Sequence, residues 1–206
     1  MKQVNLKISG AFKIKIKYFY DKRGFFCDLN VKKFKELRKL NFSNNCLSFS
    51  KKNVIRGLHY QTENLQGHFI HIINGKILDV GIDLRLKSKT FKKITCNILD
   101  TRKYNTLYLP PGVAHGFISL NKENLIFYSL SEVYNKKKEK IIKFEKNLVD
   151  PKYRDHFNKK LIFAEKDIKN CISLSDMTKK DFIKWNTKPQ SHKTIKYPRL
   201  ILGKCH

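Results

Sequence analysis

The sequence is short of acidic residues. Only 17 Asp and Glu stand against 44 Lys and Arg, so the formal net charge of the 206-residue chain is +27. An excess of this size favours an anionic partner such as nucleic acid, a membrane surface or a phosphorylated substrate. It also fits a merely lysine-rich surface, because the basic residues are spread over the whole length. No RNP-like, zinc-finger or helix-turn-helix pattern is present, so we expect no specific nucleic-acid partner.

Cysteine and long apolar runs are also scarce. The five cysteines, an odd number, are scattered and form no C-x-x-C pair. This argues against a disulfide framework or a structural zinc site, and for a reducing compartment. No apolar run approaches the length needed to span a bilayer, and the N-terminal residues lack the apolar segment of a signal peptide. We therefore expect a cytoplasmic protein with no membrane partner.

The chain does contain enough apolar residues for one core. Hydrophobic residues make up 41% of it and aromatic residues 12%, which is typical of a globular protein, and the length fits one domain better than two. After about residue 46, short runs rich in Ile, Phe and Tyr alternate with turn residues at roughly ten-residue spacing. This pattern predicts an all-β fold, an antiparallel sandwich or barrel.

Local patterns predict individual elements. Apolar residues at helical spacing indicate a short amphipathic helix over residues 31–42. Asn74-Gly75 separates the strand runs 68–72 and 76–84 and predicts a two-residue β-hairpin. Further strands are expected at residues 92–99, 105–110, 115–120 and 125–134.

Two regions lack a strand pattern. Residues 136–160 are rich in Lys with few apolar anchors, and we predict them to be irregular. Residues 177–206 carry eight Lys and Arg against one Asp and have no clear period. They are expected to form a basic extension behind a domain of residues 1–176.

Three histidines, His59, His68 and His71, fall within thirteen residues and raise metal binding as one interpretation. Residues three apart in a strand face opposite sides, so His68 and His71 cannot easily share one metal. Gln61 stands where a metal-binding cupin has its second histidine. The usual set of three histidines and one carboxylate is therefore incomplete.

Proton transfer is the alternative for the same residues. A neutral imidazole inside a barrel is a good general base near neutral pH if a carboxylate fixes its tautomer. His59, His68, His115 and a tyrosine from residues 125–134 could line such a site. The spacing by itself also permits histidines that are only hydrogen-bonded core residues.

Six stretches taken together narrow these alternatives. They are RGFF (23–26), KKNVIRGLHYQ (51–61), QGHFIHIINGKILDVGIDLR (66–85), LYLPPGVAHGF (107–117), LIFYSLSEVY (125–134) and AEKD (164–167). In order and spacing they resemble the dTDP-4-dehydrorhamnose 3,5-epimerases, over about residues 13–176. The resemblance implies a cupin-like jelly-roll β-barrel that forms a homodimer and needs neither metal nor other cofactor. It also implies a nucleotide-sugar substrate, inverted at the two carbons that flank its 4-keto group.

The resemblance further implies roles for single residues. His59 would be the base that removes the protons, Asp167 the carboxylate that orients it, and Tyr128 the acid on the opposite face. Arg23 and Arg56 would meet the diphosphate, since a guanidinium suits paired phosphate oxygens. The other positions that would contact the substrate are Asp28, Asn44, Asn45, Cys46, His68, His115, Tyr134, Glu139 and Lys166.

The sequence departs from the family pattern at three places. His68 replaces a lysine that would steady the enolate, so activity is expected to fall at higher pH if His68 acts as a cation; a neutral His68 could instead donate a hydrogen bond. Cys46 lies in a segment that is usually Asn-His-Ser, and Asp28 replaces a glutamate. These changes leave open another nucleotide or sugar, or inversion at one carbon.

Two further hypotheses belong to other classes of protein. One is a metal-dependent cupin that uses His59, His68 and His115. The other is a barrel without activity whose basic surface binds nucleic acid or anionic lipid. A binding protein would have no need to keep His59, Asp167 and Tyr128 in the spacing of the family.

Overall fold

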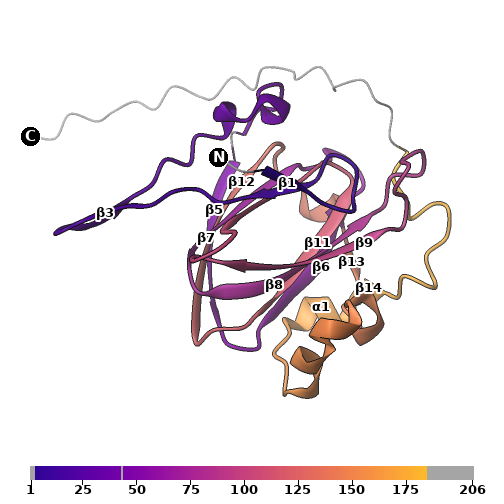
Figure 1. The fold of residues 1–206 in the computed structure, drawn as a ribbon. Coiled ribbons are helices and arrows are strands. Elements are labelled where there is room, and N and C mark those ends of the chain that lie inside the picture. Colours follow the sequence, from indigo (N-terminus) through magenta and orange to yellow (C-terminus); the bar gives the residue numbers. More distant parts are fainter. Residues whose placement is uncertain (1–2, 43, 185–206) are drawn as a thin grey trace, which may run out of the picture.

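A computed structural model describes residues 3–42 and 44–184. Two six-stranded sheets face each other and close into a jelly-roll β-barrel (Figure 1), which confirms the predicted fold class. The first sheet has the order β1 (Gln3–Asn5), β2 (Phe12–Ile14), β10 (Thr106–Leu109), β7 (His68–Asn74), β12 (Glu123–Leu130), β5 (Asn44–Lys51). The second has the order β14 (Cys171–Ile172), β13 (Glu139–Ile142), β6 (Ile55–Gln61), β11 (Val113–Ser119), β8 (Lys76–Asp83), β9 (Ile94–Asp100).

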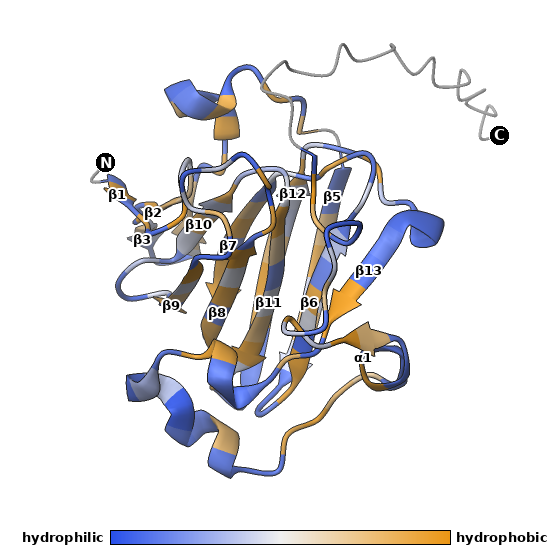
Figure 2. Cartoon of the chain, turned by 90° about the vertical axis from the view of Figure 1, so that its right-hand side faces the viewer, coloured by the Kyte–Doolittle hydropathy of each residue, from blue (hydrophilic) through white to orange (hydrophobic). Residues whose placement is uncertain are grey.

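Burial follows from the place of each strand in its sheet. The central strand β11 is buried at all seven positions, because one face turns into the barrel and the other is covered from outside. The edge strand β9 alternates between buried and half-buried residues. Apolar colour accordingly dominates the central strands of the second sheet in Figure 2, and polar colour the outer turns.

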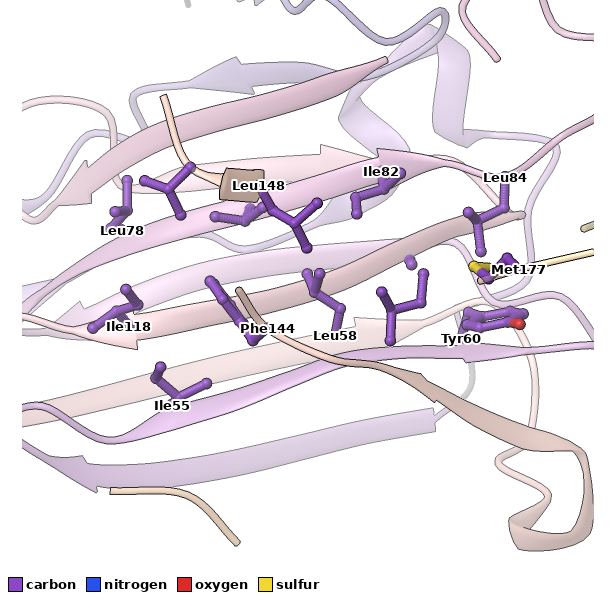
Figure 3. Close-up of a cluster of buried hydrophobic side chains, with 14 of the residues drawn as sticks. Ile55, Leu58, Tyr60, Leu78, Ile82, Leu84, Ile118, Phe144, Leu148 and Met177 are labelled. Atoms are coloured by element: carbon purple, nitrogen blue, oxygen red, sulfur yellow. The ribbon is translucent and has the colours of Figure 1, made fainter. Parts of the chain in front are cut away.

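Apolar residues form three clusters, one inside the barrel and one on the outer face of each sheet. The interior cluster joins β7 and β12 to β8, β9 and β11. On the outside of the second sheet, Phe144, Leu148 and Met177 pack over residues of β6, β8 and β11 (Figure 3). On the outside of the first sheet, Phe34 and Leu37 pack near Phe69.

The predicted hairpin at Asn74-Gly75 is wrong. β7 pairs with β10 and β12 in the first sheet, whereas β8 pairs with β9 and β11 in the second. Gly75, with φ of 97°, carries the chain from one sheet to the other, and the Lys76 N–H donates to Asn124 Oδ1 at 2.9 Å. The turn residues fit a sharp bend, but burial on both faces decides which sheet each strand joins.

The predicted helix at residues 31–42 is also wrong. Two short 3₁₀ helices, η1 (Val31–Lys33) and η2 (Lys35–Leu37), are separated by Phe34 in extended conformation. The ring of Phe34 lies 6.1 Å from that of Phe69, centroid to centroid. Packing of this side chain on the sheet interrupts a segment that is too short to hold a helix by itself.

The region 136–160 is more regular than predicted. It contains η3 (Lys136–Lys138), β13 (Glu139–Ile142), η4 (Lys146–Leu148) and η5 (Pro151–Asn158). The sequence signal was weak because β13 has only four residues, of which the last two are buried.

The folded unit continues past residue 176. Met177, Phe182 and Ile183 are buried in the cluster outside the second sheet, so the first part of the expected extension packs on the barrel. The rest of the extension, residues 185–206, lies outside the described residues. Within the described part of the chain, no helix is long and apolar enough to cross a membrane.

Two further elements complete the fold. A short helix, α1 (Glu165–Lys169), lies beside β14. Among the described residues, strands β3 (Phe19–Asp21) and β4 (Gly24–Phe26) pair only with each other. They form a two-stranded arm that projects away from the barrel (Figure 1).

Candidate functional site

A cavity of about 410 Å³ opens between the two sheets. Its polar side chains come from both sheets and from the segment of α1. They are Cys46, Ser48, Arg56, His59, His68, His115, Tyr128, Lys166 and Asp167. The fold thus gathers into one site most of the residues that the sequence singled out, from positions more than a hundred residues apart.

The first pair in the cavity is His59 on β6 with Asp167 on α1. His59 Nε2 donates to Asp167 Oδ1 at 2.8 Å, and the Gly57 N–H donates to Asp167 Oδ2 at 3.3 Å. Burial acts to raise the pKa of Asp167, but His59, the Gly57 N–H and Lys166 together outweigh it, and the pKa is lowered. Because an ionised carboxylate only accepts hydrogen bonds, Nε2 carries the proton and His59 Nδ1 holds a lone pair.

Gly57 allows this close approach. Its φ is 94°, and a Cβ atom at this position would lie 2.5 Å from the backbone oxygen of His115. Any other residue would therefore be strained and would push β6 away from β11. This steric constraint is the structural reason for the glycine in the R-G-L-H motif.

A second histidine–carboxylate pair was missed from the sequence. His115 Nε2 lies 2.6 Å from Asp79 Oδ2, and Asp79 is fully buried on β8. Burial raises the pKa of Asp79, and its Oδ1 has no hydrogen-bond partner in the described part of the chain. The available signal was an acidic residue in the middle of the mostly apolar strand run 76–84.

Tyr128 lies on the other sheet, across the cavity from His59. Its hydroxyl is 3.2 Å from Ser48 Oγ of the neighbouring strand β5. Burial raises the pKa of Tyr128 above its ordinary value, so the phenol stays protonated at neutral pH. An imidazole on the second sheet therefore faces a phenol on the first.

His68 and His71 project from opposite faces of β7, as their spacing predicts. His68 lines the cavity, with its ring centroid 5.4 Å from that of His115, while His71 bonds to Tyr18 on the outer side. Burial, with His115 and His59 nearby, lowers the pKa of His68 to about 3. The lowered pKa disfavours a cationic His68 and favours the alternative of a neutral ring that donates a hydrogen bond. Desolvation disfavours the charged imidazole.

The rim of the cavity holds a polar cluster. Lys166 Nζ and the Tyr134 hydroxyl both donate to Glu139 Oε2 at 3.0 Å, and Glu139 Oε1 lies 3.9 Å from His59 Nδ1. Arg56 lines the cavity and donates to Ser50 Oγ at 3.0 Å. Three positions expected near the substrate, Tyr134, Glu139 and Lys166, are thus in direct contact with one another.

Six expected site residues do not line this cavity: Tyr134 and Glu139 of the polar cluster, and Arg23, Asp28, Asn44 and Asn45. Arg23 is at the arm, with 91% of its side chain exposed and a salt bridge to Asp21. Asp28 pairs with Lys33 at the surface. Asn44 and Asn45 lie on β5 next to Cys46. Within the described residues, no group of three or more His, Cys, Asp or Glu side chains is arranged to hold a metal ion.

Comparisons with a family model, with related sequences and with solved structures agree with one another. A family model described as dTDP-4-dehydrorhamnose 3,5-epimerase matches residues 5–176. The enzyme of that name from Methanothermobacter thermautotrophicus is 34% identical over 134 residues, which cover 64% of this chain and 72% of the relative. The one from Shigella flexneri is 36% identical over 144 residues, covering 68% and 80%.

Two crystal structures share the fold over nearly their whole length. The dTDP-4-dehydrorhamnose 3,5-epimerase of Sulfolobus tokodaii has a TM-score of 0.72 at 36% identity, covering 85% of this chain and 96% of that one. The dTDP-6-deoxy-D-glucose-3,5-epimerase of Legionella pneumophila, in complex with dTDP-4-keto-L-rhamnose, has a TM-score of 0.79 at 27% identity, covering 90% and 98%.

Proposed function

The chain belongs to the dTDP-4-dehydrorhamnose 3,5-epimerase family, and from this premise we infer that it is an isomerase of nucleotide-linked sugars. It inverts C3 and C5 of dTDP-4-dehydro-6-deoxyglucose to give dTDP-4-dehydrorhamnose. Both carbons flank a ketone, so their protons are acidic and an enolate can form on removal of either. We propose the roles of the residues below.

The observation that carries the proposed mechanism is the placement of a base and an acid on opposite walls. His59 on the second sheet takes the proton from C3 or C5 through Nδ1, whose lone pair is free because Nε2 is bonded to Asp167. Tyr128 on the first sheet delivers a proton from the other side. Removal on one face and delivery on the other invert the carbon.

The enolate between these two steps needs hydrogen-bond donors. His68 and His115 line the same cavity as His59 and Tyr128. Since desolvation lowers the pKa of His68 and disfavours its charged form, we propose that the neutral ring donates a hydrogen bond to the sugar oxygen in place of a full charge. His115, held by Asp79, supports the same oxygen or a neighbouring hydroxyl.

The nucleotide end of the substrate needs cations and hydrogen-bonding groups. Arg56 lines the cavity and is placed for the diphosphate, and Lys166, Glu139 and Tyr134 form a polar rim. We propose that the nucleotide lies along β5, where Asn44, Asn45 and Cys46 follow one another.

We further propose that the active form is a homodimer. Arg23 and Asp28 do not line the cavity of their own subunit, and Arg23 lies on an arm that projects away from the barrel, which favours contact with the substrate of a second copy. The arm and β5 also expose large apolar side chains, an arrangement that favours association. These are Phe19, Phe25, Phe26, Leu47 and Phe49.

We also propose a cytoplasmic location. The four cysteines in the described residues are free, which fits a reducing compartment.

Hydrogen exchange tests the reaction directly. The protein is incubated with dTDP-4-dehydro-6-deoxyglucose in deuterium oxide, and the sugar is followed by NMR. Deuterium at both C3 and C5 supports the proposal. Its loss in His59→Ala but not in His156→Ala, a histidine on η5 that does not line the cavity, assigns the base. Label at one carbon would make the protein a single-site epimerase. No exchange with any of a panel of 4-keto sugars would contradict the function.

A further inference from the structure

The arm of β3 and β4 leaves the barrel directly after Tyr18. The arm carries Arg23 at its turn and exposes Phe19 and Phe26 by more than half. In the described part of the chain its two strands pair only with each other, so the direction in which it projects depends on how its root is attached.

Tyr18 attaches this root to the outer face of the first sheet. Its hydroxyl is 2.8 Å from His71 Nε2 and donates to the Ile72 backbone oxygen at 2.9 Å. Its ring stacks on Phe25 of β4, with centroids 4.8 Å apart and planes inclined by 11°. One side chain therefore links the sheet to the far strand of the arm.

The network continues from His71 to the chain just before Tyr18. His71 Nδ1 is 2.7 Å from Thr106 Oγ1, and Thr106 contacts Asn105 Oδ1 at 3.1 Å. Asn105 accepts from the Ile16 N–H and donates to the Ile16 backbone oxygen. His71, Thr106 and Asn105 are almost fully buried, so the root is held on both sides by groups that water does not reach.

One hydrogen bond of this network is present in both tautomers of His71. Burial lowers the pKa of His71 to about 4, so the ring is neutral at physiological pH and has one N–H. With Nε2 protonated, His71 donates to Tyr18, which donates to Ile72. With Nδ1 protonated, His71 donates to Thr106 and accepts from Tyr18. The bond between Tyr18 and His71 exists in both tautomers, whereas the outer contacts alternate.

We propose that Tyr18 and His71 are positioning residues: their bond fixes the direction of the arm and thereby places Arg23 at the diphosphate bound to a second copy. The inference rests on the proposed function and the proposed dimer. Neither residue lines the cavity, so both act through Arg23 and leave the proton transfers unchanged.

Tyr18→Phe removes only the hydroxyl, and Tyr20→Phe is its matched control on the same arm, with an exposed ring. Amide hydrogen exchange of residues 17–27, read by mass spectrometry, is expected to quicken in Tyr18→Phe and stay unchanged in Tyr20→Phe. The KM and the Kd for dTDP are expected to rise roughly 3–10-fold in Tyr18→Phe, the effect of one lost hydrogen bond. kcat should stay within about twofold, because the bond lies outside the reacting groups.

The double variant separates positioning from general destabilisation. In an Arg23→Ala background, adding Tyr18→Phe should leave the Kd for dTDP unchanged, because the residue being positioned is already gone. Two results would overturn the inference. One is equal amide hydrogen exchange of the arm in Tyr18→Phe and Tyr20→Phe, and the other is an additive loss of dTDP affinity in the double variant. If the unaltered protein bound no dTDP, the proposed function would fail instead, and the exchange of the arm would still decide whether Tyr18 anchors it.

Discussion

Replacing His71 by phenylalanine is expected to remove a large part of the protein's sensitivity to acid. His71 is fully buried between Tyr18 and Thr106, and burial lowers its pKa to about 4. In the unfolded chain the same side chain has a pKa of about 6.5. Between these two values, the unfolded state binds a proton that the folded state does not.

The size of the effect follows from this difference. Stability from the neutral His71 is fully present above pH 6.5 and is lost as the pH falls towards 4, since protons stabilise the unfolded state. With about 1.4 kcal/mol for each pKa unit, the free energy of unfolding should fall by about 3 kcal/mol between pH 7 and pH 4 through this residue alone. His71→Phe starts lower at pH 7, because Tyr18 and Thr106 lose their partner, but its decrease should be smaller by that amount.

Urea denaturation followed by far-UV circular dichroism at pH 7, 5.5 and 4 measures the difference. His156→Gln serves as the control, because His156 is partly exposed and its replacement should leave the decrease almost unchanged. If the free energy of unfolding of His71→Phe and of the unaltered protein fell in parallel from pH 7 to pH 4, the burial argument would be refuted.

Three predictions concern the reaction. Asp167→Asn should lower kcat by about 10³- to 10⁴-fold with little change in KM, since the amide no longer holds His59 in the required tautomer; a rise in KM alone, in NMR initial rates, would contradict this. In Tyr128→Phe, His59 should still exchange deuterium at C3 and C5, while inverted product forms about 100-fold more slowly; equal loss of exchange and of inversion would be the contrary result. The pH–rate profile from 6 to 9 should contain no step from His68, whose pKa is lowered to about 3; a step that disappears in His68→Gln would show that the ring titrates there.

Much of the site was predictable because its motifs are local. R-G-L-H and LIFYSLSEVY place His59 and Tyr128 on strands, and the resemblance to the family assigned both residues to one site. The spacing of His68 and His71 fixed their opposite faces by the period of a strand alone. These features depend on neighbours within a few residues, and the fold leaves them unchanged.

Other features needed the tertiary structure, because they depend on distant contacts. Asp79 becomes the partner of His115 only when β8 lies beside β11. The dipeptide Asn74-Gly75 predicts a turn, but only the pairing of β7 and β8 with other strands shows that this turn joins two sheets.

The sequence by itself thus determined the strand pattern, the family and the histidine, aspartate and tyrosine that line the cavity. Only the tertiary structure decided that burial lowers the pKa of His68 and that Arg23 lies on the arm, outside the cavity. The physical reason is that charge state and reach depend on which groups exclude water or project from the barrel. The order of residues along the chain does not specify either property.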